Sequence, residues 1–176
     1  MNFTPTPLDG AFIIENKKFE DERGFFLRFW DANKFSKSGL NSNVIQCNTS
    51  YTKIKGTIRG LHYQISPHEE SKLIWCIKGE IFDVIVDLRP ESKTFKKWFS
   101  IQLTSDNYKM LYVPEGFANG FQSLKDEVKI FYQNSQYYAS ESERGIRWND
   151  PTFNINWPLK PTLISKKDKS WKNFQE

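Results

Sequence analysis

The stretch 57–64, Thr-Ile-Arg-Gly-Leu-His-Tyr-Gln, contains the residues with the clearest chemical potential. It sets Arg59 three residues before His62 on what reads as one strand, and the chain has only one other histidine, His68. Imidazole titrates near neutral pH when unperturbed, so His62 is the first candidate for moving a proton. A core histidine with a purely structural hydrogen bond is the alternative.

Other side chains could complete a proton-transfer set that needs no metal. Such chemistry requires a base, an acid and a group that holds developing negative charge. His62 can be the base, Tyr132 an acid that stays protonated at neutral pH, and Lys72 the cation beside an enolate oxygen. A carboxylate could orient the histidine, as in catalytic triads. Residue types alone make this set self-consistent and no more.

Metal ligands are scarce in the sequence. The two histidines do not form a His-x-His pair, and the two cysteines, Cys47 and Cys76, do not form a Cys-x-x-Cys pair. We therefore expect no metal site, and a metal-dependent oxygenase is only a remote alternative. Both cysteines sit in apolar, strand-like runs, so we expect them to be buried free thiols in a reducing compartment.

Three cations could contact a phosphate group: Arg23 in an Asp-Glu-Arg-Gly turn, Arg59 and Lys72. Arginine can donate two parallel hydrogen bonds to phosphate oxygens. The chain has neither a Gly-x-Gly-x-x-Gly nor a Walker A pattern, so a phosphate site here would be built from side chains. A solvated surface position is the alternative for each cation.

Length and composition favour one β-rich domain over 1–176. A chain of 176 residues can bury a full core, and its 16% aromatic content suits β-strands and a pocket that stacks on a flat ligand. The net charge of +4 is too small for a dedicated nucleic-acid binder. We see no signal peptide and no apolar run long enough to span a bilayer, so we expect a cytoplasmic protein without a membrane partner.

Short strand-like runs alternate with turn signals, which indicates a sandwich or barrel. A short helix is expected at 31–38 with Asp31 as its cap, and a second could cover 165–174 within an otherwise irregular C-terminal part. The runs 73–77 and 81–88, split by Lys-Gly-Glu, read as a hairpin. The strands are expected at 11–14, 24–30, 44–51, 57–64, 73–77, 81–88, 99–103, 109–113, 120–123 and 127–133.

Alternation along strands assigns side chains to faces. It sets Lys72 beside Ile74 on one face, and it sets Asp83 and Tyr132 among apolar neighbours on theirs. Acidic and phenolic groups are costly to bury without a partner, so an exposed strand face is the slightly favoured interpretation for Asp83 and Tyr132.

Several longer motifs occur in the order in which one enzyme family has them. They are Asp-Glu-Arg-Gly-Phe-Phe at 21–26, Gln-Cys-Asn-Thr-Ser at 46–50, Arg-Gly-Leu-His-Tyr-Gln at 59–64, Phe-Asp-Val at 82–84, Asp-Leu-Arg-Pro at 87–90, Pro-Glu-Gly-Phe-Ala at 114–118, Glu-Ser-Glu-Arg-Gly-Ile at 141–146 and Ser-Lys-Lys-Asp at 165–168. Through these motifs the chain resembles the dTDP-4-dehydrorhamnose 3,5-epimerase family over nearly its whole length.

The resemblance implies a cupin-like jelly roll with short peripheral helices, a homodimer with strands exchanged or paired between subunits, and no metal or redox cofactor. It implies that His62 removes a proton beside a C4 ketone and that Asp168 orients His62. It further implies that Tyr132 returns a proton on the opposite face while Lys72 stabilises the enolate. The nucleotide-sugar site would be completed by Arg23 and Arg59 at the diphosphate and by Gln46, Asn48, Glu143 and Lys167.

Two positions depart from the family pattern. The family commonly reads Pro-Glu-Gly-Phe-Ala-His-Gly-Phe, and here the histidine is replaced by Asn119, an amide that cannot act as a base. The strand after the Arg-Gly turn usually has a glutamate where this chain has Arg28, which only donates hydrogen bonds. Asn119 could restrict the reaction to one carbon, and Arg28 could suit a cytosine edge better than a thymine edge.

The resemblance therefore implies an isomerase that inverts C3, C5 or both of a nucleotide-linked 4-keto-6-deoxy sugar through an enolate, in deoxysugar and surface polysaccharide biosynthesis. The substrate would be a nucleotide-diphosphate sugar, dTDP-linked by default. A single-centre epimerase acting on a CDP- or GDP-linked sugar is the nearest alternative. A non-catalytic nucleotide-sugar binding protein is remote, because all four proton-transfer residues are present.

Overall fold

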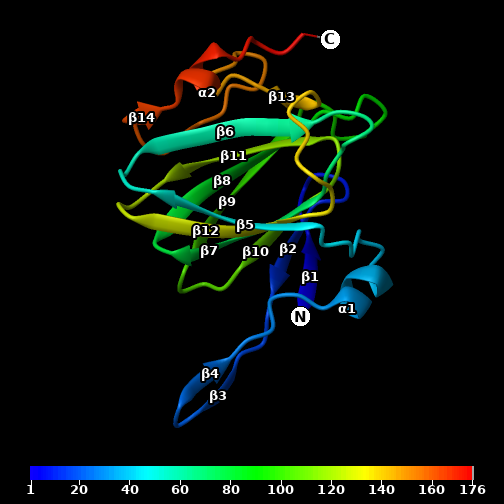
Figure 1. The fold of residues 1–176 in the computed structure, drawn as a ribbon, viewed down its shortest axis with the longest axis vertical. Helices are drawn as coiled ribbons and strands as arrows, with labels where there is room; N and C mark the ends of the chain where they lie inside the picture. The colour runs from blue at the N-terminus through cyan, green and yellow to red at the C-terminus, as the bar shows by residue number, and fades with distance from the viewer. Residues whose placement is uncertain (176) are drawn as a thin grey trace.

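The computed structural model describes residues 1–175, and two packed β-sheets dominate it (Figure 1). The first sheet has the strand order β1 (Asn2–Pro5), β2 (Phe12–Glu15), β10 (Met110–Val113), β7 (Lys72–Lys78), β12 (Val128–Asn134) and β5 (Gln46–Thr52). The second has the order β13 (Glu143–Gly145), β6 (Thr57–Gln64), β11 (Phe117–Ser123), β8 (Glu80–Asp87) and β9 (Trp98–Thr104), and β14 (Leu163–Ile164) pairs with β6. The expected all-β fold is confirmed.

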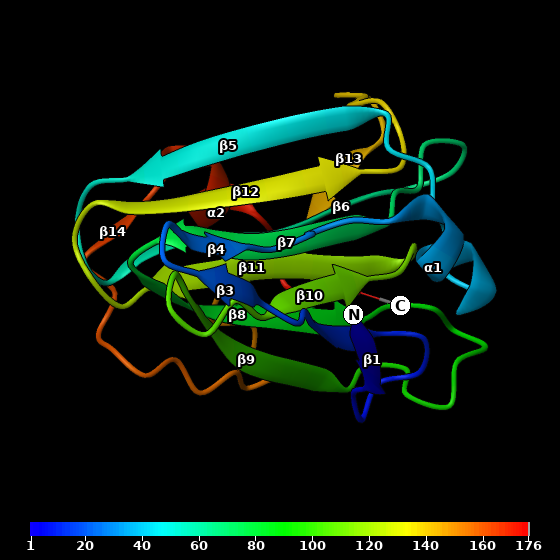
Figure 2. The same ribbon diagram turned by 90° about the horizontal axis from the view of Figure 1, so that it is seen from below.

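The main core fills the space between the sheets. Because side chains alternate along a strand, every second residue of β7, β8, β11 and β12 points inward. Ile74 and Cys76 of the first sheet meet Ile85 of the second there, and all three are almost fully buried. Figure 2 shows β5, β12, β7 and β10 lying side by side in the first sheet.

Two further apolar clusters cover the outer faces of the sheets. On the first sheet, Trp75 and Met110 pack with Phe35 of α1 (Ala32–Lys37). On the second, residues such as Val84 pack with Phe153 of the C-terminal segment. Helix α1 begins as expected, because Asp31 accepts a hydrogen bond from the backbone N–H of Lys34 at 3.2 Å.

The hairpin expected from 73–77 and 81–88 is wrong. The strand β7 pairs with β10 and β12, whereas β8 pairs with β11 and β9 in the opposite sheet. Both strands are largely buried and sit inside their sheets, so each already has two partners. The turn at Gly79, with φ of +83°, therefore leads the chain from one sheet to the other.

Several boundaries and burials also differ from expectation. The strands β1, β3 (Phe19–Asp21), β13 and β14 are not among the expected strands. The strand predicted at 24–30 is only β4 (Gly24–Phe26), and the last helix is only α2 (Lys166–Ser170). Cys47 is exposed, because it points outward from the edge strand β5, while Cys76 is buried as expected. Asp83 is fully buried and Tyr132 packs against the main core, which overturns the exposed-face interpretation of both.

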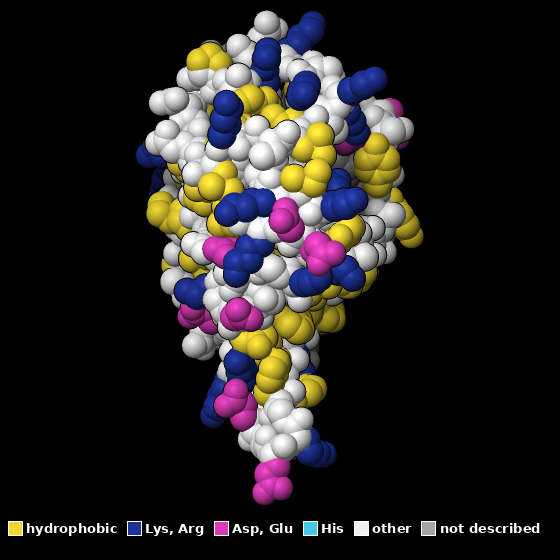
Figure 3. Space-filling view, turned by 90° about the vertical axis from the view of Figure 1, so that its left-hand side faces the viewer, with side chains coloured by type: hydrophobic (Ala, Val, Ile, Leu, Met, Phe, Trp, Pro, Cys, Tyr) yellow, Lys and Arg dark blue, Asp and Glu magenta, His cyan; other side chains and the backbone are white. Residues whose placement is uncertain are grey.

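A two-stranded arm projects from the sandwich. It consists of β3 (Phe19–Asp21) paired with β4, and all six strand residues are exposed (Figures 1 and 3). Its aromatic side chains are unusually open to solvent, with Phe19 at 60%, Phe25 at 49% and Phe26 at 58% exposure. Large apolar groups of this kind commonly mark a contact surface.

Candidate active site

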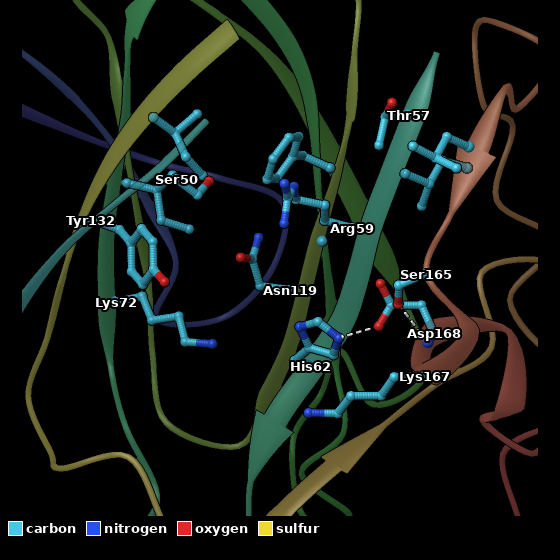
Figure 4. A pocket seen from close by; sticks show the side chains of 16 residues that line it. Ser50, Thr57, Arg59, His62, Lys72, Asn119, Tyr132, Ser165, Lys167 and Asp168 are labelled. Carbon is cyan, nitrogen blue, oxygen red and sulfur yellow. Dashed lines mark hydrogen bonds and ion pairs between the residues drawn. The ribbon is translucent and has the colours of Figure 1, made fainter. Parts of the chain in front are cut away.

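A cavity of about 420 Å³ opens between the two sheets (Figure 4). The first sheet contributes Lys72 and Ile74 of β7 and Tyr132 of β12 to its wall. The second contributes His62 of β6 and Asn119 of β11. The cavity is large enough for part of a nucleotide sugar, and its polar groups converge from opposite walls.

A β-bulge explains why two residues three apart on β6 both face the cavity. Simple alternation would send Arg59 and His62 to opposite faces. The register against β11 shifts, so that His62 pairs with Asn119 but Arg59 pairs with Phe121, which adds one residue to β6. The bulge needs glycine, since a Cβ on Gly60 would lie 2.6 Å from the Cα of Gly120.

The outer edge of β6 leaves one gap, and Asp168 fills it. The start of β6 pairs with β14, and its end pairs with β13. Between them, the backbone N–H of Gly60 faces the Asp168 carboxylate at 3.4 Å. Asp168 stands in the first turn of α2, where its own N–H donates to the Ser165 hydroxyl oxygen at 3.0 Å. This cap orients the carboxylate toward β6.

A short polar contact in the cavity joins His62 to Asp168. The Nε2 atom of His62 lies 2.6 Å from Oδ1 of Asp168, and the Asp168 side chain is only 6% exposed. Burial raises the pKa of Asp168, but the hydrogen bond and charge of His62 outweigh it and hold that pKa below its ordinary value. An ionised Asp168 accepts the Nε2 proton, which leaves Nδ1 as the unprotonated nitrogen of neutral His62.

Tyr132 and Lys72 occupy the wall opposite His62 (Figure 4). Burial raises the pKa of Tyr132, and the negative charge of Glu70 raises it further, while Arg59 works in the other direction. The phenol therefore remains a proton donor at neutral pH. The ammonium group of Lys72 lies 3.0 Å from a carboxylate oxygen of Glu70.

Asn119 is held by the buried Asp83. Its amide nitrogen donates to Oδ1 of Asp83 at 2.6 Å and to the backbone oxygen of Val84 at 3.2 Å. Both amide hydrogens are thus engaged, so the carbonyl oxygen is the atom left for the cavity (Figure 4). Burial raises the pKa of Asp83 to about 7, although Asn119 and the charge of Lys72 work against it.

A second ion pair lies beside His62. The ammonium group of Lys167 contacts Glu143 at 2.5 Å, and the Tyr138 hydroxyl donates to the same carboxylate oxygen at 2.7 Å. Burial raises the pKa of Glu143, but Lys167 and Tyr138 outweigh it and hold the pKa below its ordinary value. Lys167 lines the cavity, whereas the predicted substrate-binding residue Glu143 contacts Lys167 but is not part of the lining.

The structure brings most of the sequence-predicted residues to one cavity, but not all. Seven line it: Arg59, His62, Lys72, Asn119, Tyr132, Lys167 and Asp168. Gln46 and Asn48 lie on the edge strand β5, where the Gln46 side chain accepts a hydrogen bond from the Tyr138 backbone N–H at 2.9 Å. Arg23 and Arg28 belong to the arm and its base, where they pair with Asp21 and Asp31.

Sequence reasoning missed several polar residues of the cavity wall, namely Ser50, Thr57 and Ser165. Ser50 could have been found, because alternation sets it on the same face as Asn48. It also missed Glu70, which contacts Lys72 from a stretch that reads as a polar loop. Within residues 1–175, no group of three or more His, Cys, Asp or Glu side chains is arranged to hold a metal ion.

Comparison with known proteins identifies the family. The family model described as dTDP-4-dehydrorhamnose 3,5-epimerase matches residues 5–176. The chain belongs to this family. A dTDP-4-dehydrorhamnose 3,5-epimerase of Shigella flexneri is 42% identical over 175 residues, which cover 99% of this chain and 96% of the relative.

Solved structures of the family match the fold closely. The dTDP-4-dehydrorhamnose 3,5-epimerase of Elizabethkingia anophelis superposes with a TM-score of 0.95 at 38% identity, covering 99% of this chain and 96% of the other. The enzyme from Bacillus anthracis, solved with TDP and PPi bound, also gives 0.95 at 38% identity, covering 98% and 99%. The expected cupin-like jelly roll is confirmed, and the chain is an epimerase and so an isomerase. None of the described helices is long and apolar enough to cross a membrane.

Proposed function

We propose that the chain epimerises a dTDP-linked 4-keto-6-deoxy sugar at C3 and C5 in deoxysugar biosynthesis. One observation supports this above the others. The His62–Asp168 pair and Tyr132 face each other from different sheets across one cavity, so a sugar ring between them has a base on one side and an acid on the other.

The reaction follows from the chemistry of those groups. The C4 ketone acidifies the C–H bonds at C3 and C5, and His62 takes the proton while Asp168 stabilises the imidazolium that forms. The electron pair of the broken C–H bond moves to the ketone oxygen, where the ammonium group of Lys72 stabilises the enolate. The electron pair of the enolate returns to the same carbon and takes a proton from Tyr132 on the opposite face, so the ketone re-forms and the carbon is inverted. His62 then loses its proton to solvent and Tyr132 regains one from solvent. The second centre requires the ring to be presented again to His62.

Proton exchange tests this proposal directly. The protein would be incubated in deuterated water with dTDP-4-keto-6-deoxyglucose, and the sugar protons followed by NMR. Loss of both the C3 and the C5 signals supports the double epimerase. Loss of one signal identifies a single-centre enzyme, which Asn119 gives reason to consider, and the absence of exchange would contradict the proposal. His62→Ala is the matched control. The variant should bind the nucleotide almost as well as the parent protein but should no longer exchange the sugar protons.

The nucleotide remains a separate proposal. We propose dTDP, because the family's curated members act on dTDP sugars by name. Arg28 offers only donors to a base edge, which would suit a CDP sugar, but it lies outside its own cavity and would have to act in the site of a second copy. Isothermal titration with dTDP, CDP and GDP distinguishes them: preference for dTDP over CDP by tenfold or more, roughly the effect of one good hydrogen bond, would reject the role assigned to Arg28.

We also propose a homodimer in which the arm packs against a second copy. Two features support it: the three exposed phenylalanines of the arm, and the position of Arg23, whose side chain is 89% exposed and away from its own cavity. If the arm completes the partner's site, mixed dimers of Arg23→Ala and His62→Ala would regain activity. One site of each mixed dimer would then combine an intact His62 with an intact Arg23 from the other subunit, while the second site would lack both. Monomers in light scattering, or no recovery on mixing, would contradict it. The cytoplasmic location remains a prediction.

A further inference from the structure

Glu70 lies two residues before the start of β7, and its side chain is buried against Lys72, which lines the cavity. One of its carboxylate oxygens lies 3.0 Å from the ammonium nitrogen of Lys72, and the two side chains are only 8% and 14% exposed. A buried ion pair loses much hydration, and removing one partner leaves the other charge without compensation. Glu70 therefore constrains where the Lys72 ammonium group can stand.

The second carboxylate oxygen of Glu70 reaches the neighbouring strand. It accepts a hydrogen bond from the amide nitrogen of Asn134 on β12 at 2.8 Å. Asn134 pairs directly with Lys72 across the two strands, and Tyr132 is two residues earlier on β12. Both partners of Glu70 donate, so a carboxylate, which only accepts, fits both at once. Glu70 thus ties together the ends of the strands that present Lys72 and Tyr132.

The charge of Glu70 also acts on Tyr132. Burial is the main cause of the raised pKa of Tyr132, and Glu70 is the second cause. Other charged groups face this pair: Arg59 of β6 opposes the effect on Tyr132, and the buried Asp83 of β8 interacts with Lys72. Of these charged groups, only Glu70 lies within ion-pair distance of Lys72 in the described part of the chain.

We propose that Glu70 is a positioning residue that fixes the Lys72 ammonium group at the enolate oxygen and, through Asn134, holds the end of β12 that presents Tyr132. This inference rests on the proposed epimerase function. It adds a residue that acts through Lys72 and Tyr132 without touching the reacting carbons. Glu70 would then hold the Lys72 ammonium group in place before the enolate forms, as preorganised electrostatic stabilisation requires.

The test compares Glu70→Gln with a matched control, Glu127→Gln. Glu127, the residue before β12, pairs with Lys78 at the far end of β7 at the same 3.0 Å distance, but in solvent, with side chains 60% and 54% exposed. Both variants would be assayed for kcat, KM and the pH dependence of kcat. Thermal unfolding and dTDP binding would show that each is folded.

Glu70→Gln is expected to lower kcat about tenfold or more while KM changes less than about threefold, because the lost interaction acts on the enolate and not on the bound sugar. The fall of kcat at high pH, which we call the basic limb and assign to loss of the Tyr132 proton, is expected at lower pH in this variant. The reason is that removal of the negative charge of Glu70 lowers the pKa of Tyr132. Glu127→Gln is expected to match the parent protein. An unchanged kcat in Glu70→Gln, or a rise in KM alone, would overturn the inference.

A second variant covers the case in which Glu70→Gln does not fold. Glu70→Asp keeps the charge but draws it back by one methylene, so kcat should fall while the basic limb stays in place. Full activity in Glu70→Asp would overturn the positioning role. The two proposals fail in different ways. If the parent protein exchanges no sugar protons, the proposed epimerase function is wrong. If the parent protein exchanges them and Glu70→Gln does so equally well, only the role of Glu70 is wrong.

Discussion

Replacement of Asp168 by asparagine should damage the reaction more than its replacement by alanine. The carboxylate accepts two hydrogen bonds, from His62 at 2.6 Å and from the Gly60 N–H at 3.4 Å. An asparagine has one oxygen and one NH₂ group. The Gly60 N–H can only donate, so it favours the oxygen on its side and turns the NH₂ group toward His62. His62 must then accept at Nε2 and carry its proton on Nδ1, where the base should be free.

The size of the loss follows from these two effects. A hydrogen bond to a charged group contributes about 1.5–3 kcal/mol, so its removal in Asp168→Ala should slow turnover about 10- to 150-fold. The inverted tautomer in Asp168→Asn adds to this, and the corresponding change in Ser-His-Asp triads costs about 10⁴-fold. We expect Asp168→Asn to approach that larger value.

The assay is deuterium uptake into the sugar at saturating substrate, followed by NMR for the parent protein and both variants. The affinity for dTDP should change little, because binding of the nucleotide does not require the proton of His62 to be on a particular ring nitrogen. If Asp168→Asn retained more activity than Asp168→Ala, the tautomer argument would be refuted. If both stayed within about threefold of the parent, a difference below 1 kcal/mol, Asp168 would not orient the base at all.

Three further predictions test other parts of the site. Tyr132→Phe should lower product formation about 10²-fold or more, the usual effect of removing a general acid, while deuterium uptake at the carbon beside His62 continues. Equal losses of product formation and deuterium uptake would contradict separate roles for Tyr132 as acid and His62 as base. Burial raises the pKa of Asp83 from 3.8 to about 7, so the folded state binds the extra proton and stability should fall as pH rises from about 4 to about 7. Urea unfolding of Asp83→Asn should lack this decline, and parallel pH curves for parent and variant would argue against it. Gly120→Ala would set a Cβ 2.7 Å from the backbone oxygen of Arg59, so we expect a loss of about 1–3 kcal/mol in unfolding free energy together with activity; a fully active variant would show that the bulge is not needed.

The sequence predicted the elements of the sandwich better than their connections. Strand 57–64 and the capped helix at 31–38 follow from local patterns that tertiary contacts reinforce. The hairpin failed at Gly79, because a short turn and two apolar runs are equally compatible with a crossing between sheets. What decides between them is whether each strand finds two other partners, and that depends on contacts far along the chain.

The site was predictable by residue type and only partly by position. His62 and Arg59 stood out locally, yet strict alternation sets them on opposite faces, and only the bulge at Gly60 reconciles them. Asp168 is 106 residues from His62, and no periodicity links the two. Its role could be expected only from the family resemblance. Glu70 escaped notice because surface ion pairs are common and its burial cannot be read from a polar stretch.

The division of the site between two sheets has a consequence for how it can be altered. The base and its carboxylate belong to the β6 side, whereas the acid and the enolate-stabilising cation belong to β12 and β7. The gap between them is therefore set by the core packed between the sheets, in which Ile74 is buried and also lines the cavity. Protein interiors are close-packed, so a change in core volume shifts one wall against the other. Substitutions that never touch the sugar can thus change how well the base and the acid reach the same carbon.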